Sequence, residues 1–306
     1  MSLNYKDRYY NHFEKRDGKN PPKFEKDKNY MMRFDAPLSH FKFEDNNLTI
    51  IYFKDGVGEL QWKNKRIKVE ANKFIITNPS IGWEYVNERQ GYIDVLSLVI
   101  CDALREQFNY FVSTSQVRLL DNPFHSISNQ TYFMEQMFGA NYYRSGWLLQ
   151  SIYRLSNNID YAQTCPEELS IDVLQTIYND QYRGYGLATH IASKKPSTKL
   201  ETLKRLLRAN EYIQDNLMNP ISLDELSRVS TLSKYHLYNS FKLVYGKTPH
   251  QYINSLKIKK AQKILQNQKL SVSEVSDLFG FSDLAVFSKL FKKVYGKPPS
   301  YYLLSK

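Results

Sequence analysis

The sequence has few of the features that mark disulfide frameworks, membrane spans or metal sites. Only two cysteines, Cys101 and Cys165, occur among 306 residues, so we expect both thiols to be reduced and structural. No window holds the roughly 18 uncharged apolar residues of a membrane-crossing helix, and the first residues lack the apolar core of a signal peptide. The six histidines are scattered rather than grouped at ligand spacing. These absences favour a cytoplasmic protein with no membrane segment, no metal and no other cofactor.

Glycine and proline are also scarce, with 12 and 11 residues, beside a hydrophobic content of 42%. That balance is typical of packed globular domains, and the length predicts two of them. The sequence contains no Gly-rich phosphate loop, nucleophile elbow or convincing catalytic constellation. We therefore expect a protein that is not an enzyme.

Acidic residues are scarce in the last third of the chain. Residues 200–306 contain 17 Lys and Arg against 8 Asp and Glu, so they carry +9 of the total net charge of +11. Positive charge confined to one part of a chain is expected where that part alone binds a polyanion. A solvated basic surface would explain the charge equally well, so charge does not decide the function.

The same third contains an internal repeat. Ser222–Ile253 (SLDELSRVSTLSKYHLYNSFKLVYGKTPHQYI) matches Ser271–Leu303 (SVSEVSDLFGFSDLAVFSKLFKKVYGKPPSYYL), at an offset of 49 residues that becomes 50 in the later helix region. Each copy begins with Ser and Glu three residues apart, the capping box that starts a helix. A short helix, a turn and a second helix follow in both copies, which is the order of a helix-turn-helix unit.

The second helix of each copy has a predicted buried face. Ser233 and Ser282 are placed to cap these helices. The predicted buried positions are Leu237, Phe241 and Val244 in the first copy and Phe287, Phe291 and Val294 in the second. A further helix over residues 252–267, about 22 Å long at 1.5 Å per residue, joins the two copies. Two reading helices about 34 Å apart would enter successive major-groove turns on one face of DNA.

The opposite face of each second helix is predicted to contact DNA. Lysine bonds phosphates or guanine edges, asparagine pairs with adenine, and small apolar groups meet the thymine methyl group. The residues predicted to read bases are Tyr235, Tyr238, Asn239, Leu284, Ala285, Ser288 and Lys289. Those predicted to contact phosphates are Lys234, Lys242, Lys247, Lys257, Lys292 and Lys297. Either face alone could be an ordinary solvated surface, and the repetition together with the charge favours DNA reading.

This arrangement resembles the AraC/XylS family of bacterial transcription regulators. The resemblance covers residues 200–306 and is carried by Gly280–Asp283, Phe287–Lys292 and Gly296–Tyr301, with first-copy counterparts at Leu232–Leu237 and Gly246–Pro249. It implies reading helices at 234–244 and 284–294. It also implies double-stranded promoter DNA as a partner and activation through RNA polymerase. Some members carry Arg on these faces where this chain does not, so an operator sequence cannot be transferred.

The preceding two-thirds begins with short apolar or alternating runs that predict strands. They lie at Leu48–Phe53, Glu59–Trp62, Ile67–Val69, Phe74–Thr77 and Tyr92–Ile100, with turns at Asp55–Gly58 and Asn78–Ser80. Many short strands predict a barrel or a sandwich, and the resemblance favours a cupin-like barrel that binds a small-molecule effector. Candidate effector contacts are His40, Tyr52, Trp62, Trp83 and Tyr85, although aromatic residues in strands more often form core.

Beyond Ala103 the pattern becomes helical, and the helix predicted at Glu167–Ile191 carries an apolar stripe of Leu169, Val173, Leu174, Ile177 and Tyr178. The stripe either covers the barrel or, as the resemblance suggests, forms a homodimer interface. Ser193–Ser197 reads as a linker, and Thr198 with Glu201 as the cap of the next helix.

The predicted fold is thus α+β and multidomain. A cupin-like sensor and possible dimerisation domain with trailing helices spans residues 1–192, a linker spans 193–199, and an all-α domain of two helix-turn-helix units joined by a helix spans 200–306. The leading hypothesis is an effector-responsive activator. A constitutive or partner-controlled DNA binder with an empty barrel, and a cupin-type enzyme fused to a DNA-binding module, are the alternatives.

Overall fold

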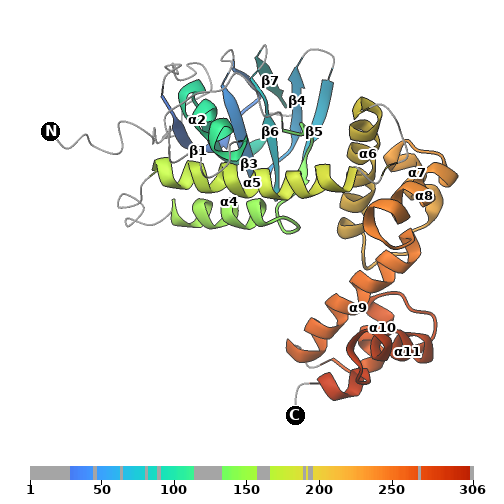
Figure 1. The fold of residues 1–306 in the computed structure, drawn as a ribbon. Helices are drawn as coiled ribbons and strands as arrows, with labels where there is room; N and C mark the ends of the chain where they lie inside the picture. The colour runs from blue at the N-terminus through green and yellow to red at the C-terminus, as the bar shows by residue number, and fades with distance from the viewer. Residues whose placement is uncertain are drawn as a thin grey trace. The chain divides into compact units, whose positions relative to one another are not determined.

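The structure is a computed structural model that describes residues 28–43, 47–62, 65–79, 82–87, 91–113, 133–156, 166–188, 191, 196–267 and 270–303. The chain divides into two compact units, Met1–Tyr182 and Arg183–Lys306 (Figure 1). The first unit contains all the described strands, and the described part of the second is helical. Cys165 and linker residues 193–195 lie outside the described residues.

The strands of the first unit form two antiparallel sheets. The five-stranded sheet has the order β1 (Tyr30–Pro37), β8 (Tyr92–Ile100), β3 (Leu48–Gly56), β6 (Lys73–Thr77) and β9 (Phe138–Gly139). The four-stranded sheet has the order β2 (His40–Phe43), β7 (Trp83–Val86), β4 (Gly58–Trp62) and β5 (Lys65–Val69). No hydrogen-bonded pair of described strands joins the two sheets. The first unit is therefore rich in strands as predicted, but its described strands form two sheets rather than one closed barrel.

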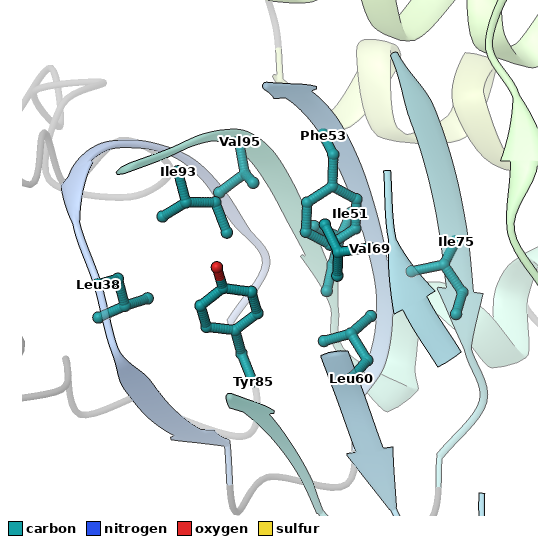
Figure 2. Packing of buried hydrophobic residues seen from close by; sticks show 9 residues of the cluster. All are labelled: Leu38, Ile51, Phe53, Leu60, Val69, Ile75, Tyr85, Ile93 and Val95. Atoms are coloured by element: carbon teal, nitrogen blue, oxygen red, sulfur yellow. The ribbon is translucent and has the colours of Figure 1, made fainter. Parts of the chain in front are cut away.

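The two sheets share a hydrophobic core. Figure 2 shows side chains from both sheets pointing toward one another, and they comprise Leu38, Ile51, Phe53, Leu60, Val69, Ile75, Tyr85, Ile93 and Val95. The predicted turn at 55–58 joins β3 of one sheet to β4 of the other, and Gly56 and Gly58 adopt φ values of +133° and +154° there. A Cβ at Gly58 would lie 2.7 Å from Cε2 of Tyr85, so a glycine is required where the chain passes this ring.

Helices cover the other face of the five-stranded sheet. They are α2 (Asp102–Ser113), α4 (Arg144–Leu155) and α5 (Pro166–Ala188), of which α4 and α5 run side by side in Figure 1. The backbone N–H and hydroxyl of Ser145 in α4 donate to Asp180 of α5 at 2.9 and 2.8 Å. The α5 residues Val173, Leu174 and Ile177 are fully buried. Most of the predicted apolar stripe thus packs inside this unit, which fits its predicted covering role.

The second unit consists of helices in the predicted order. They are α6 (Pro196–Asp215), α7 (Leu223–Ser230), α8 (Lys234–Tyr245), α9 (Pro249–Asn267), α10 (Val272–Leu278), α11 (Leu284–Tyr295) and a closing 3-10 helix, η2 (Pro299–Tyr302). The predicted joining helix is confirmed as α9, which begins three residues earlier than expected. Residues 196–199, predicted as linker, belong to α6, and Thr198 lies inside that helix instead of capping it.

Local side-chain caps fix where these helices begin. Both predicted capping boxes are present, at Ser222 with Glu225 and at Ser271 with Glu274. Ser233 caps α8 as predicted, but Ser282 does not cap α11. The carboxylate of Asp283, one residue nearer the helix, accepts the Ala285 backbone N–H at 2.7 Å. Within the described ranges, none of the helices combines the length and the hydropathy needed to cross a membrane.

Candidate nucleic-acid interface

Helix α8 has one buried face and one exposed face. Leu237, Phe241 and Val244 are buried, as predicted from their spacing. Tyr235 on the opposite side is 81% exposed, Tyr238 is also exposed, and Asn239 is half-buried beside them. The buried residues anchor the helix, so its first two turns present two phenols and an amide to solvent.

Helix α11 repeats this geometry with different chemistry. Phe287 and Phe291 are fully buried against α9 and α10. Leu284 and Val286 are 44% and 49% exposed, and Ala285 between them is also exposed. The first turn of α11 is therefore an apolar surface in solvent. Val286 belongs to this surface but was not among the residues predicted to read bases. The signal in the sequence was its position directly after Ala285, which was predicted to be exposed.

The next turn of α11 is polar and basic. Lys289 is exposed and Ser288 is half-buried, so all seven predicted base-reading residues have solvent-accessible side chains on α8 or α11. Val294, predicted to be buried, is 46% exposed. The prediction was wrong because Tyr295 closes this end of the core, packing on Phe291 at 5.0 Å and on Tyr302 at 5.6 Å between ring centroids.

Exposed lysines lie on α8 and α11 and just beyond their ends. Those predicted to contact phosphates and found exposed are Lys234, Lys242, Lys247, Lys292 and Lys297. Lys234 forms an ion pair with Asp224, and the Nζ of Lys297 lies 5.5 Å from the centroid of the Tyr301 ring. Lys242, Lys247 and Lys292 form no ion pair with any described residue. Their charges are thus available to an external anion.

Lys257 does not fit the predicted phosphate role. Lys257 is only 7% exposed, and its Nζ donates a hydrogen bond of 2.6 Å to the backbone carbonyl of Phe279. Burial lowers the pKa of the Lys257 ammonium. The sequence placed this residue among four lysines of the joining helix, and only its position on the buried side distinguishes it from the others.

The predicted effector residues of the first unit do not line one pocket. Tyr85 lies in the core between the sheets and donates to the Val57 carbonyl at 2.7 Å, whereas Tyr52 faces the helices and donates to Asn72 at 3.1 Å. His40 is exposed and lies 3.5 Å from a carboxylate oxygen of Glu84. Tyr52 and Tyr85 therefore do not face a common space, because neighbouring strand positions point to opposite faces of a sheet.

The two remaining candidates, Trp83 and Trp62, differ from one another. Trp83 is partly buried and stacks on Phe43 with ring centroids 5.2 Å apart, so it is part of the core. Trp62 ends β4, and its side chain lies outside the described structure. In the described part of the chain, no group of three or more His, Cys, Asp or Glu side chains could hold a metal ion.

A buried polar cluster that the sequence did not reveal lies between the five-stranded sheet and α4. The Tyr153 hydroxyl donates to Asp94, and Arg33 donates to that hydroxyl at 2.6 Å. The Arg33 guanidinium also lies over the Tyr153 ring, 4.3 Å from its centroid. Burial, and then the bonded Asp94 carboxylate, raise the pKa of Tyr153. This cluster ties α4 to β1 and β8.

The comparisons with known proteins concern mainly the last third of the chain. A family model described as a helix-turn-helix domain matches residues 226–305. The Msm operon regulatory protein of Streptococcus mutans is 30% identical over 112 residues, which are 37% of this chain and 39% of that protein. The HTH-type transcriptional activator AarP of Providencia stuartii is 35% identical over 94 residues, which are 31% of this chain and 70% of AarP.

Among solved structures, a transcriptional regulator from Chromobacterium violaceum with an AraC-type DNA-binding domain shares 24% identity, covering 32% of this chain and 88% of that one with a TM-score of 0.31. The matched segments span less than half the length of the first curated relatives, at 42%, 39% and 30%. The match to most of AarP, the helix-turn-helix model and the paired units of the second domain together identify the chain as a member of the AraC/XylS family of transcription regulators.

Proposed function

We propose that this protein is a sequence-specific DNA-binding regulator that reads promoter DNA with α8 and α11. The observation that carries the proposal is the repeated geometry of the second unit, in which each helix-turn-helix buries one face of its second helix and exposes the other. The joining helix α9, 19 residues long, spans about 28 Å at 1.5 Å per residue. That length suits two readers in successive major-groove turns.

The two reading helices recognise bases in different ways. On α8, Asn239 pairs with an adenine edge while Tyr235 and Tyr238 make hydroxyl and ring contacts. On α11, Leu284, Ala285 and Val286 contact thymine methyl groups, and Lys289 bonds a guanine edge. The exposed phosphate-contacting lysines, Lys234, Lys242, Lys247, Lys292 and Lys297, fix the register of the protein on the duplex.

The first unit acts as the sensor of this regulator. Its two sheets form a cupin-like fold, and the signal that it receives is a small molecule. Such an effector acts by binding two states of the protein with different affinity, one of which is competent to bind DNA. We further propose that the protein works in the cytoplasm, forms a homodimer and activates transcription through RNA polymerase. We propose no catalytic activity, since members of this family are regulators rather than enzymes.

The direct test is selection from a random duplex library by the full-length protein at about 150 mM salt, which suppresses weak nonspecific binding. We expect two short motifs, roughly one helical turn apart, to be enriched. The matched variants are Asn239→Ala and Lys289→Ala, each of which should weaken specific binding by about 1 to 3 kcal/mol and relax one position of one motif. Failure of the wild-type protein to enrich any sequence, with and without a cell extract as a source of effector, would overturn the proposal.

A further inference from the structure

Lys257 occupies an unusual place for a lysine in a basic domain. It lies on the buried side of α9, between Ile253 and Ala261, which belong to the hydrophobic face of the same helix. A buried ammonium costs free energy unless it is hydrogen-bonded. Its Nζ meets this requirement with the carbonyl of Phe279, the residue that caps the end of α10. The carbonyls at the end of a helix have no partner within the helix, so Lys257 also satisfies an acceptor that is itself buried.

The bonded carbonyl belongs to the turn that sets the direction of α11. Phe279 is followed by Gly280, with a φ of +65°, and α11 begins at Leu284. The Nζ of Lys257 also lies 5.8 Å from the ring centroid of Phe281, on the other side of Gly280. Lys257 therefore holds both sides of the turn between the two helices of the second helix-turn-helix unit.

The same helix holds the first reading helix one and a half turns earlier. The ring of Tyr252 packs against Phe241 and Tyr245 of α8, with centroids 5.3 and 5.1 Å away. Tyr252 and Lys257 are five residues apart on α9, so the helix connects the core of α8 to the turn before α11 over a short and rigid distance. A Cβ added to Gly280 would lie 3.9 Å from the carbonyl oxygen of Met218, so this turn is close to the loop between α6 and α7.

A related contact in the first copy of the helix-turn-helix supports a structural role for Lys257. There, Arg205 of the preceding long helix α6 donates to the carbonyl of Thr231 in the turn before α8, at 3.1 Å. Arg205 is partly exposed and is also paired with Glu201 at 3.1 Å. In both copies, a basic side chain of the preceding long helix thus bonds the turn between the two helices of the helix-turn-helix. Only in the second copy is that side chain buried and without an acidic partner among the described residues.

We propose that Lys257 is a positioning residue that fixes α11 relative to α8 and so sets the half-site spacing that the protein recognises. The inference rests on the proposed function. Apolar packing of α9 against α10 and α11 tolerates small rotations, whereas a hydrogen bond to one carbonyl is directional. A one-base-pair change in spacing moves a half-site by about 3.4 Å and about 35°, which is large compared with the tolerance of that bond.

The test compares full-length wild type with Lys257→Met, which keeps the side-chain length but removes the donor. Lys259→Met is the matched control, because Lys259 is an exposed lysine on the same helix. Binding is measured on the selected site and on versions with one base pair added or removed between the half-sites, each over a series of salt concentrations. We expect the spacing preference of wild type to fall about tenfold in Lys257→Met, the scale of one lost base contact, and to persist in Lys259→Met. The salt dependence of Lys257→Met should match wild type.

Each other result has a definite meaning. A salt slope smaller by about 0.9 with unchanged spacing preference would make Lys257 a phosphate contact and overturn the inference. No change in either quantity would overturn it as well. If Lys257→Met does not fold, as judged by its thermal unfolding, Lys257→Gln carries the test. Glutamine keeps a hydrogen-bond donor on a shorter side chain, so this variant should lose part of the spacing preference of wild type and retain the rest. A wild type that binds every spacing equally would refute the inference alone, whereas a wild type with no selected site would refute the proposed function first.

Discussion

Replacing thymine by uracil in the half-site that we propose α11 reads tests the role of its apolar first turn directly. The substitution removes one methyl group per base from the major groove and leaves base pairing and phosphates unchanged. The first turn of α11 presents Leu284, Ala285 and Val286 to solvent, and none of the three carries a hydrogen-bonding side chain. Burying a methyl or methylene group against apolar surface is worth about 0.8 kcal/mol. Loss of two such contacts therefore predicts a cost of about 1.6 kcal/mol, or about 15-fold in Kd.

The assay is competition between thymine-containing and uracil-containing duplexes for the full-length protein at fixed salt. The internal control is the same replacement in the half-site read by α8, where Tyr238 and Asn239 supply polar contacts and the loss should be smaller. The half-sites are assigned from the position that Lys289→Ala relaxes. In Leu284→Ala, the penalty for uracil should shrink, because the variant and the missing methyl group remove the same contact.

Equal affinity for thymine and uracil in the α11 half-site would refute the apolar reading. Equal losses in both half-sites would refute it too, because that outcome would indicate a change in DNA shape rather than a contact with α11. A change in salt slope on uracil substitution would point to altered phosphate contacts and would equally contradict the reasoning.

Three further predictions concern charge, a buried hydrogen bond and pH. Lys292→Ala should weaken binding to all sequences alike and reduce the salt slope by about 0.9, as measured by titrations at several salt concentrations. Tyr153→Phe should lower the free energy of unfolding by about 1.5 to 3 kcal/mol in denaturant titrations, because it removes a hydrogen bond to the buried Asp94 carboxylate. Hydrogen bonds from Ser271 lower the pKa of Glu274 below its usual 4.5, so the stability from this cap is present above that pH and is lost as the pH falls through the lowered value. The difference in melting temperature between wild type and Glu274→Gln should accordingly narrow below pH 4.5, and a constant difference would contradict the assignment.

The second unit was predictable because its determinants are local. A capping box such as Ser222 with Glu225 specifies a helix start within four residues, and the repeat displays the same signals twice. The buried positions follow from helical spacing alone, so Phe241 and Phe291 could be placed in the core without knowing any neighbour. Where the prediction failed, at Val294, the deciding contact comes from Tyr302 beyond the end of the helix.

The first unit was less predictable because its determinants are long-range. The run Leu48–Phe53 is apolar at nearly every position, and both faces of β3 are buried. An alternating pattern is therefore missing, and the sequence cannot say that Tyr52 faces the helices while Ile51 and Phe53 face the other sheet. The order of strands in the two sheets, and hence which aromatic residues meet, depends on pairings up to 69 residues apart, such as Tyr30 with Val99. The Arg33, Asp94 and Tyr153 cluster was missed for the same reason.

The two copies of the repeat share their core positions and differ in the exposed faces of α8 and α11. Phe241 and Phe291 occupy the same place in their units, whereas the exposed Tyr235 and Tyr238 of α8 contrast with the exposed Leu284 and Val286 of α11. Under the proposed function, one chain therefore presents two different readers in a fixed order along α9. The proposal therefore predicts an asymmetric site that is bound in one orientation, and one copy of the chain is enough to set that orientation. A site with the two half-sites in reversed order, and a palindromic site made from either half, should accordingly both bind one chain more weakly than the natural order at constant spacing, since only one half-site at a time fits a reader of that chain.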